Sequence, residues 1–251
     1  LNVDESKAIT CVGEEDEVKI GGERFLEFTA RCCKEGILPE NCYCVRLYRT
    51  TYEGERLVNT TQVNYVDPLD RKQILEADQE LRHQMNIITD FLRKYVPGYE
   101  HCTIKTGAST LGIRESRRFS GKYVMNISDL REARRFPDVV VHKAQFVVDI
   151  HNPVGGGQAN GIAEYVDAYD IPWRSLVPQK MENLILAGRC ISGTHEAMAS
   201  YRVMAIAMAI GEAAGIGAAL AIDHDVTPEN LDVKYIQKAL MDKGAVLFDE
   251  K

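Results

Sequence analysis

The sequence predicts an α+β fold made mainly of antiparallel strands, with one long helix and one strand–helix unit of parallel type. Short β-like runs separated by turn residues recur through residues 1–180. Apolar residues recur with helical spacing over residues 71–95. Near the C-terminus, the apolar run 184–187 and Gly188 precede a long stretch of Ala, Met, Ile and Gly, which is typical of a buried strand that leads into a helix.

Length, charge and cysteine content narrow the class of protein. A chain of 251 residues suits one large domain or two of ordinary size. The net charge of -7 gives no electrostatic reason to expect nucleic acid. The seven cysteines are odd in number and irregularly spaced, which argues against a disulfide framework, and they lack the Cys-x2-Cys spacing of zinc sites. We therefore expect reduced thiols, no metal and a cytoplasmic location.

The first third of the chain predicts short, alternating elements. Residues 18–20 form a short strand, and residues 23–34 have the apolar spacing of a helix that ends before Pro39. The β-like runs 43–48 and 56–66 are separated by a Gly-containing turn and predict an antiparallel hairpin.

One long amphipathic helix is predicted over residues 71–95. Asp70 is its expected N-cap and Pro97 follows its end. Its apolar positions recur every seven residues, at Ile74, Leu81, Ile88 and Tyr95. We expect this helix to support the fold rather than to carry chemistry.

The middle of the chain returns to β character. Residues 101–125 and 145–151 predict strands, as do residues 139–141, and residues 168–178 predict an edge strand bounded by prolines. A short helix with an N-cap is predicted at residues 128–135.

After the strand at 184–187, a helix is predicted from about Ala197 to Ile222, and a final helix begins near Thr227 and reaches Lys243. Residues 203–222 contain a single charge, at Glu212, and have the length of a membrane span.

Because the 203–222 stretch is rich in Ala and Gly with few Leu or Phe, its insertion into a membrane would be marginal, so we expect burial in a soluble protein. Gly211, Gly215 and Gly217 are expected to permit close helix–sheet packing.

Several motifs together resemble a known family. They are Asn183-Leu-Ile-Leu-Ala-Gly-Arg-Cys-Ile-Ser followed by His195-Glu-Ala, Gly112-Ile-Arg-Glu-Ser-Arg-Arg118, Asp149-Ile-His-Asn-Pro153 and Ile171-Pro-Trp-Arg-Ser-Leu-Val-Pro178. In their order along the chain, over residues 37–222, these motifs resemble the C-terminal flavin-binding part of FAD-dependent oxidoreductases related to the glutathione-reductase type. The resemblance implies a substrate domain at 1–180, the C-terminal strand–helix piece of a Rossmann-like FAD domain at 181–224, and a C-terminal helix or tail at 225–251.

The chain departs from the family at the ADP half of the cofactor site. No Gly-x-Gly-x-x-Gly follows an early strand, although this motif cradles the pyrophosphate in dinucleotide-binding folds. Since the sequence starts at Leu1 rather than Met, we expect the motif to lie upstream, in a longer protein that binds FAD. These residues on their own are then expected to be inactive and to bind FAD poorly or not at all.

The resemblance also implies the cofactor contacts Gly188, Arg189, Ser192, Arg202, Val203 and Met204. The loop that begins at Gly188 would run along the ribityl chain and pyrophosphate. The broader class often has an acidic residue where this chain has Arg189, which favours a phosphate contact or a structural ion pair. Backbone N–H groups around Val203 would stabilise negative charge on the pyrimidine edge of a reduced flavin.

His195 and His151 are the candidate acid–base residues, because imidazole exchanges protons near neutral pH, although a single histidine is often structural. In a strand, Arg114 and Arg118 would share one face while Arg117 points the opposite way. That face could bind a carboxylate or sugar-acid substrate by bidentate contacts. Pairing of these arginines with Glu115 or other carboxylates is an equally good interpretation.

The favoured hypothesis is a fragment of a flavin-dependent oxidoreductase that transfers a hydride from a small organic substrate, in particular an anionic one, to FAD. A non-catalytic binding or assembly module that keeps the substrate-domain fold without flavin is the alternative. A nicotinamide-only reductase would need a complete dinucleotide fold. We expect neither nucleic-acid nor membrane partners, and a homo-oligomer is compatible with the sequence.

Overall fold

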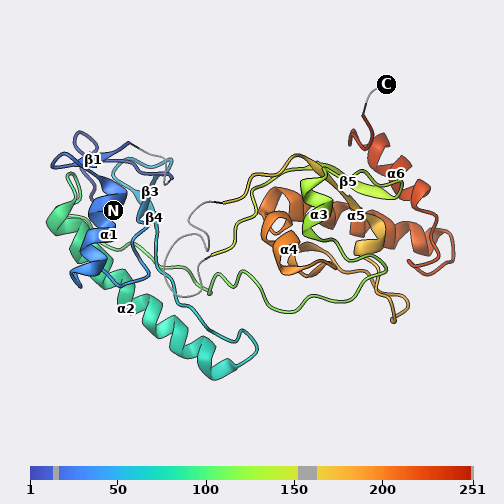
Figure 1. The fold of residues 1–251 in the computed structure, drawn as a ribbon, viewed down its shortest axis with the longest axis horizontal. Helices are drawn as coiled ribbons and strands as arrows, with labels where there is room; N and C mark the ends of the chain where they lie inside the picture. The colour runs from blue at the N-terminus through green and yellow to red at the C-terminus, as the bar shows by residue number, and fades with distance from the viewer. Residues whose placement is uncertain (14–16, 152–162, 250–251) are drawn as a thin grey trace. The chain divides into compact units, whose positions relative to one another are not determined.

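The structure, a computed structural model, describes residues 1–13, 17–151 and 163–249, which divide into two compact units (Figure 1). The first unit contains Leu1–Ile113 together with His151, and the second contains Arg114–Ile150 and residues 163–249. Within these ranges the secondary structure comprises six α-helices and three two-stranded antiparallel sheets. The α+β class is confirmed, but the sheets are smaller than predicted. The domain boundaries that the family resemblance implies, after residues 180 and 224, stay a prediction.

The first unit holds two small antiparallel sheets and two helices. In chain order these are β1 (Lys19–Ile20), β2 (Glu23–Arg24), α1 (Phe25–Lys34), β3 (Arg46–Arg49), β4 (Arg56–Asn59) and α2 (Arg71–Tyr95). β1 pairs with β2 and β3 with β4. The predicted hairpin is therefore confirmed with shorter strands.

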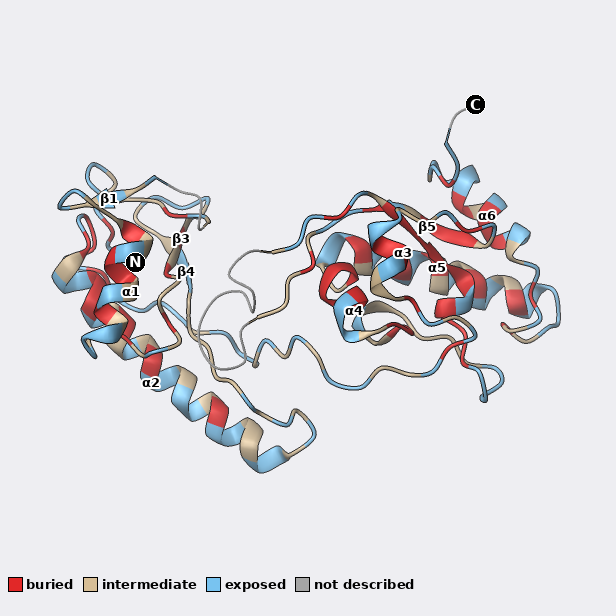
Figure 2. Cartoon of the chain, in the orientation of Figure 1, coloured by how far each residue is buried: buried red, intermediate tan, exposed pale blue. Residues whose placement is uncertain are grey.

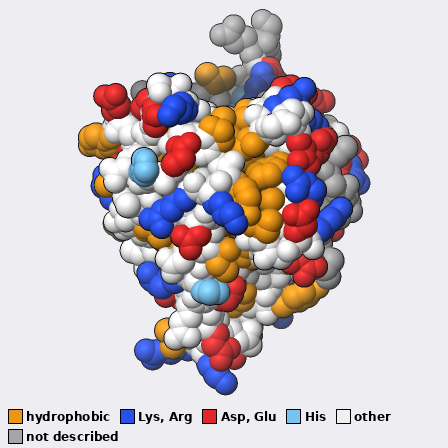
Figure 3. Space-filling view, turned by 90° about the vertical axis from the view of Figure 1, so that its left-hand side faces the viewer, with side chains coloured by type: hydrophobic (Ala, Val, Ile, Leu, Met, Phe, Trp, Pro, Cys, Tyr) orange, Lys and Arg blue, Asp and Glu red, His pale blue; other side chains and the backbone are white. Residues whose placement is uncertain are grey.

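Helix α2 has the bounds that the sequence predicts. The Asp70 carboxylate accepts the Lys72 N–H at 2.8 Å, which confirms the N-cap. The C-terminal half packs on α1, where the Phe28 and Phe91 ring centroids lie 5.9 Å apart. Exposed side chains dominate the other half of α2 (Figure 2). Apolar side chains also gather on one outer face of this unit, among charges of both signs (Figure 3).

The second unit contains one two-stranded sheet with helices packed on it. Its elements are α3 (Ile127–Arg131), β5 (Val139–Ala144), β6 (Tyr169–Pro172), the 3₁₀ turns η1 (Trp173–Ser175) and η2 (Gly188–Cys190), α4 (His195–Tyr201), α5 (Met204–Asp223) and α6 (Val233–Asp242). β5 pairs antiparallel with β6, and α5 and α6 both contact β5. The core of the unit is enclosed between them.

The predicted strand at residues 184–187 is wrong. These residues are half-buried and extended, but the described hydrogen bonds include only one that a ladder would use, from Leu186 N–H to the Leu176 carbonyl at 3.0 Å. An apolar run becomes a strand only where a second strand can pair with it, and none lies alongside in the part of the chain described. The described residues therefore do not show the strand–helix piece of a Rossmann-like domain.

The strands predicted at residues 101–125 and 145–151 are also wrong as regular elements. Gly121, Met125 and Val148 make isolated bridges, and the rest of these segments has no continuous ladder. Backbone N–H groups of these segments donate instead to carbonyl groups outside regular strands. Lys122 N–H, for example, binds the Val177 carbonyl at 2.9 Å.

Two helix boundaries differ from the prediction. The helix expected from Ala197 to Ile222 is split into α4 and α5, because Val203 is extended with φ -75° and ψ 155°. The last helix begins at Val233 and is capped by the Asp232 carboxylate, whereas Thr227 lies in a preceding turn.

Helix α5 is long and apolar enough to span a membrane, a test that core helices of soluble proteins also pass. Only 28% of its most apolar window is buried in the structure. Ile206, Ile210 and Ala213 belong to its buried stripe, while Met204 and Met208 on another side are 82% and 72% exposed. The burial that the sequence leads us to expect is therefore only partial within the described residues.

The three glycines of α5 differ in their surroundings. A Cβ on Gly217 would lie 2.4 Å from the Trp173 ring, which confirms close packing at this position. A Cβ on Gly211 or Gly215 would meet nothing within 4 Å, so the same interpretation is wrong for these two.

Gly217→Ala should lower the free energy of unfolding by about 1–3 kcal/mol, because its methyl group would overlap the buried Trp173 ring. Gly215→Ala in the same helix should raise it by about 0.5–1 kcal/mol, since Ala is the better helix former. Urea denaturation followed by far-UV circular dichroism measures both. Stabilisation of both variants would contradict the packing described.

Candidate functional site

The loop over residues 188–194 is held in place by backbone hydrogen bonds on both sides. Ser192 N–H donates to the Ser175 carbonyl at 2.9 Å, and its own carbonyl accepts from Met125 N–H at 3.1 Å. Thr194 N–H then donates to the Met125 carbonyl at 2.8 Å. The position of the residue that follows, His195, is therefore fixed by a segment about 70 residues away in sequence.

Small residues allow this loop to approach its neighbours. A Cβ on Gly193 would lie 2.6 Å from the Tyr201 hydroxyl, which donates to the Ile191 carbonyl at 3.1 Å. A Cβ on Gly121 would lie 2.7 Å from the Ser192 Cβ. Burial raises the pKa of Tyr201, so its phenol stays protonated and serves as a donor.

His195 begins helix α4 and pairs with Glu115. Its Nδ1 lies 2.6 Å from the Glu115 Oε2 atom, and the His195 side chain is 52% exposed. Glu115 also contacts the Arg118 guanidinium, whose Nε donates to the Gly193 carbonyl at 2.9 Å. A carboxylate at Nδ1 favours the tautomer with its proton on that atom, which leaves Nε2 able to accept a proton.

A second polar group forms around Asp149. Its Oδ2 atom lies 3.0 Å from an Arg114 nitrogen and 3.1 Å from an Arg202 nitrogen, and Arg202 also donates to the Asp149 carbonyl at 2.6 Å. Burial lowers the pKa of the Arg202 guanidinium, and the charges of Arg114 and Arg189 lower it further, whereas Asp149 raises it. The charges of three arginines therefore act in the region of one carboxylate.

The N-terminus of helix α5 has no side-chain cap and begins at an exposed residue. Val203 is its N-cap residue and forms no side-chain cap, and Met204 at the first helical position is 82% exposed. Open space surrounds Gly188, where a Cβ would meet nothing within 4 Å, and Arg189 is exposed. Uncapped helical N–H groups next to accessible backbone favour the binding of a negatively charged group.

The other residues that the sequence predicted for the site do not all lie where the prediction placed them. Ser192 is fully buried and its hydroxyl has no hydrogen-bond partner, so it lies under the loop rather than on its surface. His151 is half-buried and is assigned to the first unit. Both arginines of the predicted anion-binding face, Arg114 and Arg118, are paired with carboxylates.

The sequence offered Glu115 as a partner for the arginines, and its pairing with Arg118 is confirmed, but its contact with His195 and the role of Asp149 as a partner were missed. Glu115 is 80 positions from His195 in sequence, and Asp149 is 53 positions from Arg202. Both residues lie inside the motifs that carry the family resemblance, which was the available signal.

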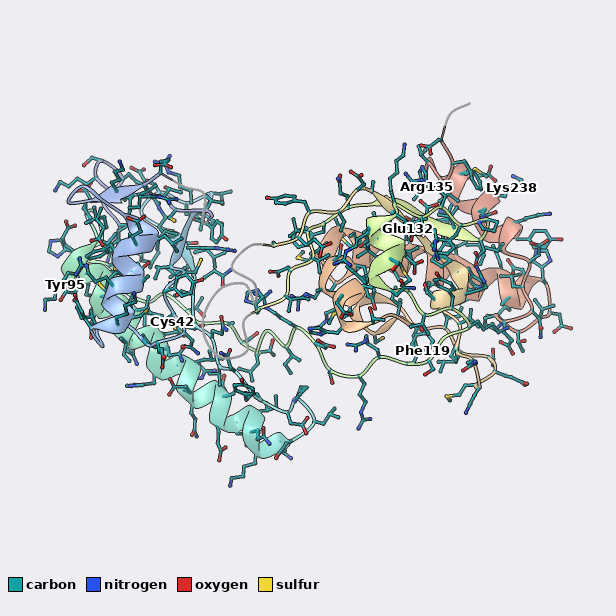
Figure 4. The ribbon with its side chains drawn as sticks, in the orientation of Figure 1. Cys42, Tyr95, Phe119, Glu132, Arg135 and Lys238 are labelled. Atoms are coloured by element: carbon teal, nitrogen blue, oxygen red, sulfur yellow. The ribbon has the colours of Figure 1, made fainter. Side chains whose placement is uncertain are left out.

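Two buried cysteines of the first unit have raised pKa values, and none of the seven cysteines forms a disulfide. Burial raises the pKa of Cys42 to about 11 and that of Cys33 to about 12, so neither is a reactive thiolate at neutral pH. Cys42 is labelled in Figure 4, in the first unit. Among residues 1–13, 17–151 and 163–249, no three His, Cys, Asp or Glu side chains are grouped as metal ligands.

Arg202→Met should lower the free energy of unfolding by about 1–3 kcal/mol, because Asp149 loses its more buried partner. Arg114→Met is the matched control. Its side chain is 50% exposed, so its loss should cost at most about 1 kcal/mol. Urea denaturation read by the fluorescence of Trp173, the single tryptophan, compares the two. An equal loss of unfolding free energy in the two variants would contradict the greater structural role of Arg202.

Comparison with known proteins identifies the family. A family model described as FAD dependent oxidoreductase matches residues 3–240. No curated protein and no solved structure matches the chain. Because the family model covers nearly all of the sequence, the chain belongs to the FAD-dependent oxidoreductase family.

Proposed function

We propose that this chain forms the proton-accepting and ring-edge half of a flavin site, in a protein that oxidises a small organic substrate by hydride transfer to FAD. Family membership supports the cofactor and the reaction class. The observation that carries the proposal further is the 2.6 Å contact between His195 and Glu115, with half of the imidazole open to solvent.

The His195–Glu115 pair supports a role in proton removal. Oxidation of an alcohol or amine releases a proton along with the hydride, and a group must accept it. Glu115 holds the imidazole by Nδ1 and stabilises the imidazolium that forms when Nε2 takes the proton. Arg118 binds the second carboxylate oxygen of Glu115, Oε1, and so fixes the orientation of the His195–Glu115 pair.

The arginines of the second polar group support an anionic binding partner. Arg114 and Arg202 both pair with Asp149, and the charge of Arg189 also acts on Arg202. Guanidinium groups bind carboxylates and phosphates by paired hydrogen bonds. Arg114 and Arg189 are exposed and can reach such a ligand, whereas the largely buried Arg202 supports Asp149 beneath them.

Bound FAD supplies the hydride acceptor. The residues that would hold it are Gly188, Arg189 and the backbone N–H groups at the start of α5, from Met204 onward. The pyrophosphate-binding Gly-rich motif, the glutathione-reductase type and a cytoplasmic location belong to the same proposal and describe the longer protein.

His195→Gln should lower the rate of flavin reduction by substrate about 10²- to 10⁴-fold, because the proton acceptor is lost. Glu115→Gln should lower it less, since the imidazole remains but loses its charged partner. The measurement is anaerobic flavin reduction in the full-length protein, with small hydroxy acids, alcohols and amines as substrates.

His83→Gln is the control, because His83 is exposed on α2 in the first unit and should leave the rate unchanged. A wild-type rate in His195→Gln would exclude the proposed role. A full-length protein without flavin would instead favour the non-catalytic binding module.

A further inference from the structure

Three cationic or potentially cationic side chains of the second unit converge on one carboxylate near the C-terminus. Lys143 forms an ion pair with Asp249. His142 Nε2 lies 3.6 Å from the Asp249 Oδ1 atom, and Arg135 Nε lies 3.7 Å from Oδ2. Arg135 follows helix α3 and is labelled in Figure 4, whereas His142 and Lys143 belong to β5. None of these residues belongs to the polar groups around His195 and Asp149.

An irregularity in β5 brings His142 and Lys143 to the same carboxylate. Consecutive residues of a regular strand point to opposite faces. Here the β5–β6 register shifts between Val141 and Ala144, and Lys143 has a left-handed backbone with φ 53°. A bulge of this kind redirects side chains, and a left-handed lysine persists only where its surroundings hold it.

The base of this cluster is buried and ordered by Asp170. The Asp170 and His142 side chains are 2% and 3% exposed, and Asp170 Oδ1 lies 2.8 Å from His142 Nδ1. Asp170 also accepts the N–H groups of Phe136 at 3.2 Å and Lys143 at 3.3 Å. The imidazole is therefore fixed by one nitrogen and points the other toward Asp249.

His142 Nε2 is left without a hydrogen bond. It is buried, and 3.6 Å to Asp249 is too long for one. A buried polar atom without a partner costs free energy and indicates a ligand that is better placed than the carboxylate now beside it. Asp249 itself is 54% exposed, so the side chain that occupies this position can leave it.

We propose that Arg135, His142 and Lys143 form a binding site for a small oxyanion, a phosphate or carboxylate group, which Asp249 occupies in this structure. The hydrogen bond from Lys143 lowers the pKa of the Asp249 carboxyl, and the charges of Lys143, His142 and Arg135 lower it further. The same groups would stabilise the negative charge of an external anion. Because Asp170 faces Nδ1, a phosphate or carboxylate oxygen that enters more deeply than Asp249 meets a donor at Nε2 only when the imidazole carries both of its ring protons.

Asp249→Asn tests the site, with inorganic phosphate as the probe and the His142 ring Cε1–H resonance as the readout. Because Asp249 competes for the site, its removal should lower the phosphate concentration at half-saturation by about tenfold or more relative to wild type. Acetate in place of phosphate then distinguishes a carboxylate ligand from a phosphorylated one by which probe binds more tightly.

Two variants control this experiment. Asp242→Asn removes the same charge from α6, where Asp242 pairs with Lys238 at 2.6 Å, and it should bind phosphate like wild type. Lys143→Asn in the Asp249→Asn background should lose the saturable shift, and Asn tolerates the left-handed backbone. The proposal is overturned if neither phosphate nor acetate binds to Asp249→Asn. It is equally overturned if Asp242→Asn gains as much affinity, or if the shift survives in the double variant.

Discussion

The hydrogen bonds that hold residues 188–194 are the constraint on which the second unit depends. Through Ser192 and Thr194 they join the loop to Met125 and Ser175. This loop sets where α4 begins, and α4 leads through Arg202 into the uncapped start of α5. His195 and the N-terminus of α5 thus share one support, which fixes their relative position.

The sequence predicted best those elements that are stabilised within themselves. Helix α2 has a complete heptad pattern and its own cap at Asp70, and its bounds were predicted correctly. The strands at 101–125 and 184–187 failed because a strand also needs a partner, and apolar alternation does not say whether one is present. The break at Val203 has no local signal either, since it follows from contacts such as that between Arg202 and Asp149.

The sequence indicated the residue types of the candidate site and one of its pairings, that of Arg118 with Glu115, but not the pairings over long sequence distances. His195 and Arg114 were identified from the chemistry of their side chains, yet their carboxylate partners come from positions 115 and 149. Tertiary packing sets pairings between residues so far apart in the sequence. The periodicity of apolar residues in a single sequence reports local structure only and does not reveal such pairings. The cluster around Asp249 escaped notice for the same reason, because it depends on a bulge in β5.

The central claim is that the start of α5 and the His195 loop serve a bound flavin. The most direct measurement is the visible absorbance spectrum of the full-length protein that contains this chain, purified and then reconstituted with FAD. Our account predicts the spectrum of an oxidised flavin that remains with the protein through gel filtration. A colourless protein that takes up no FAD on reconstitution would contradict it.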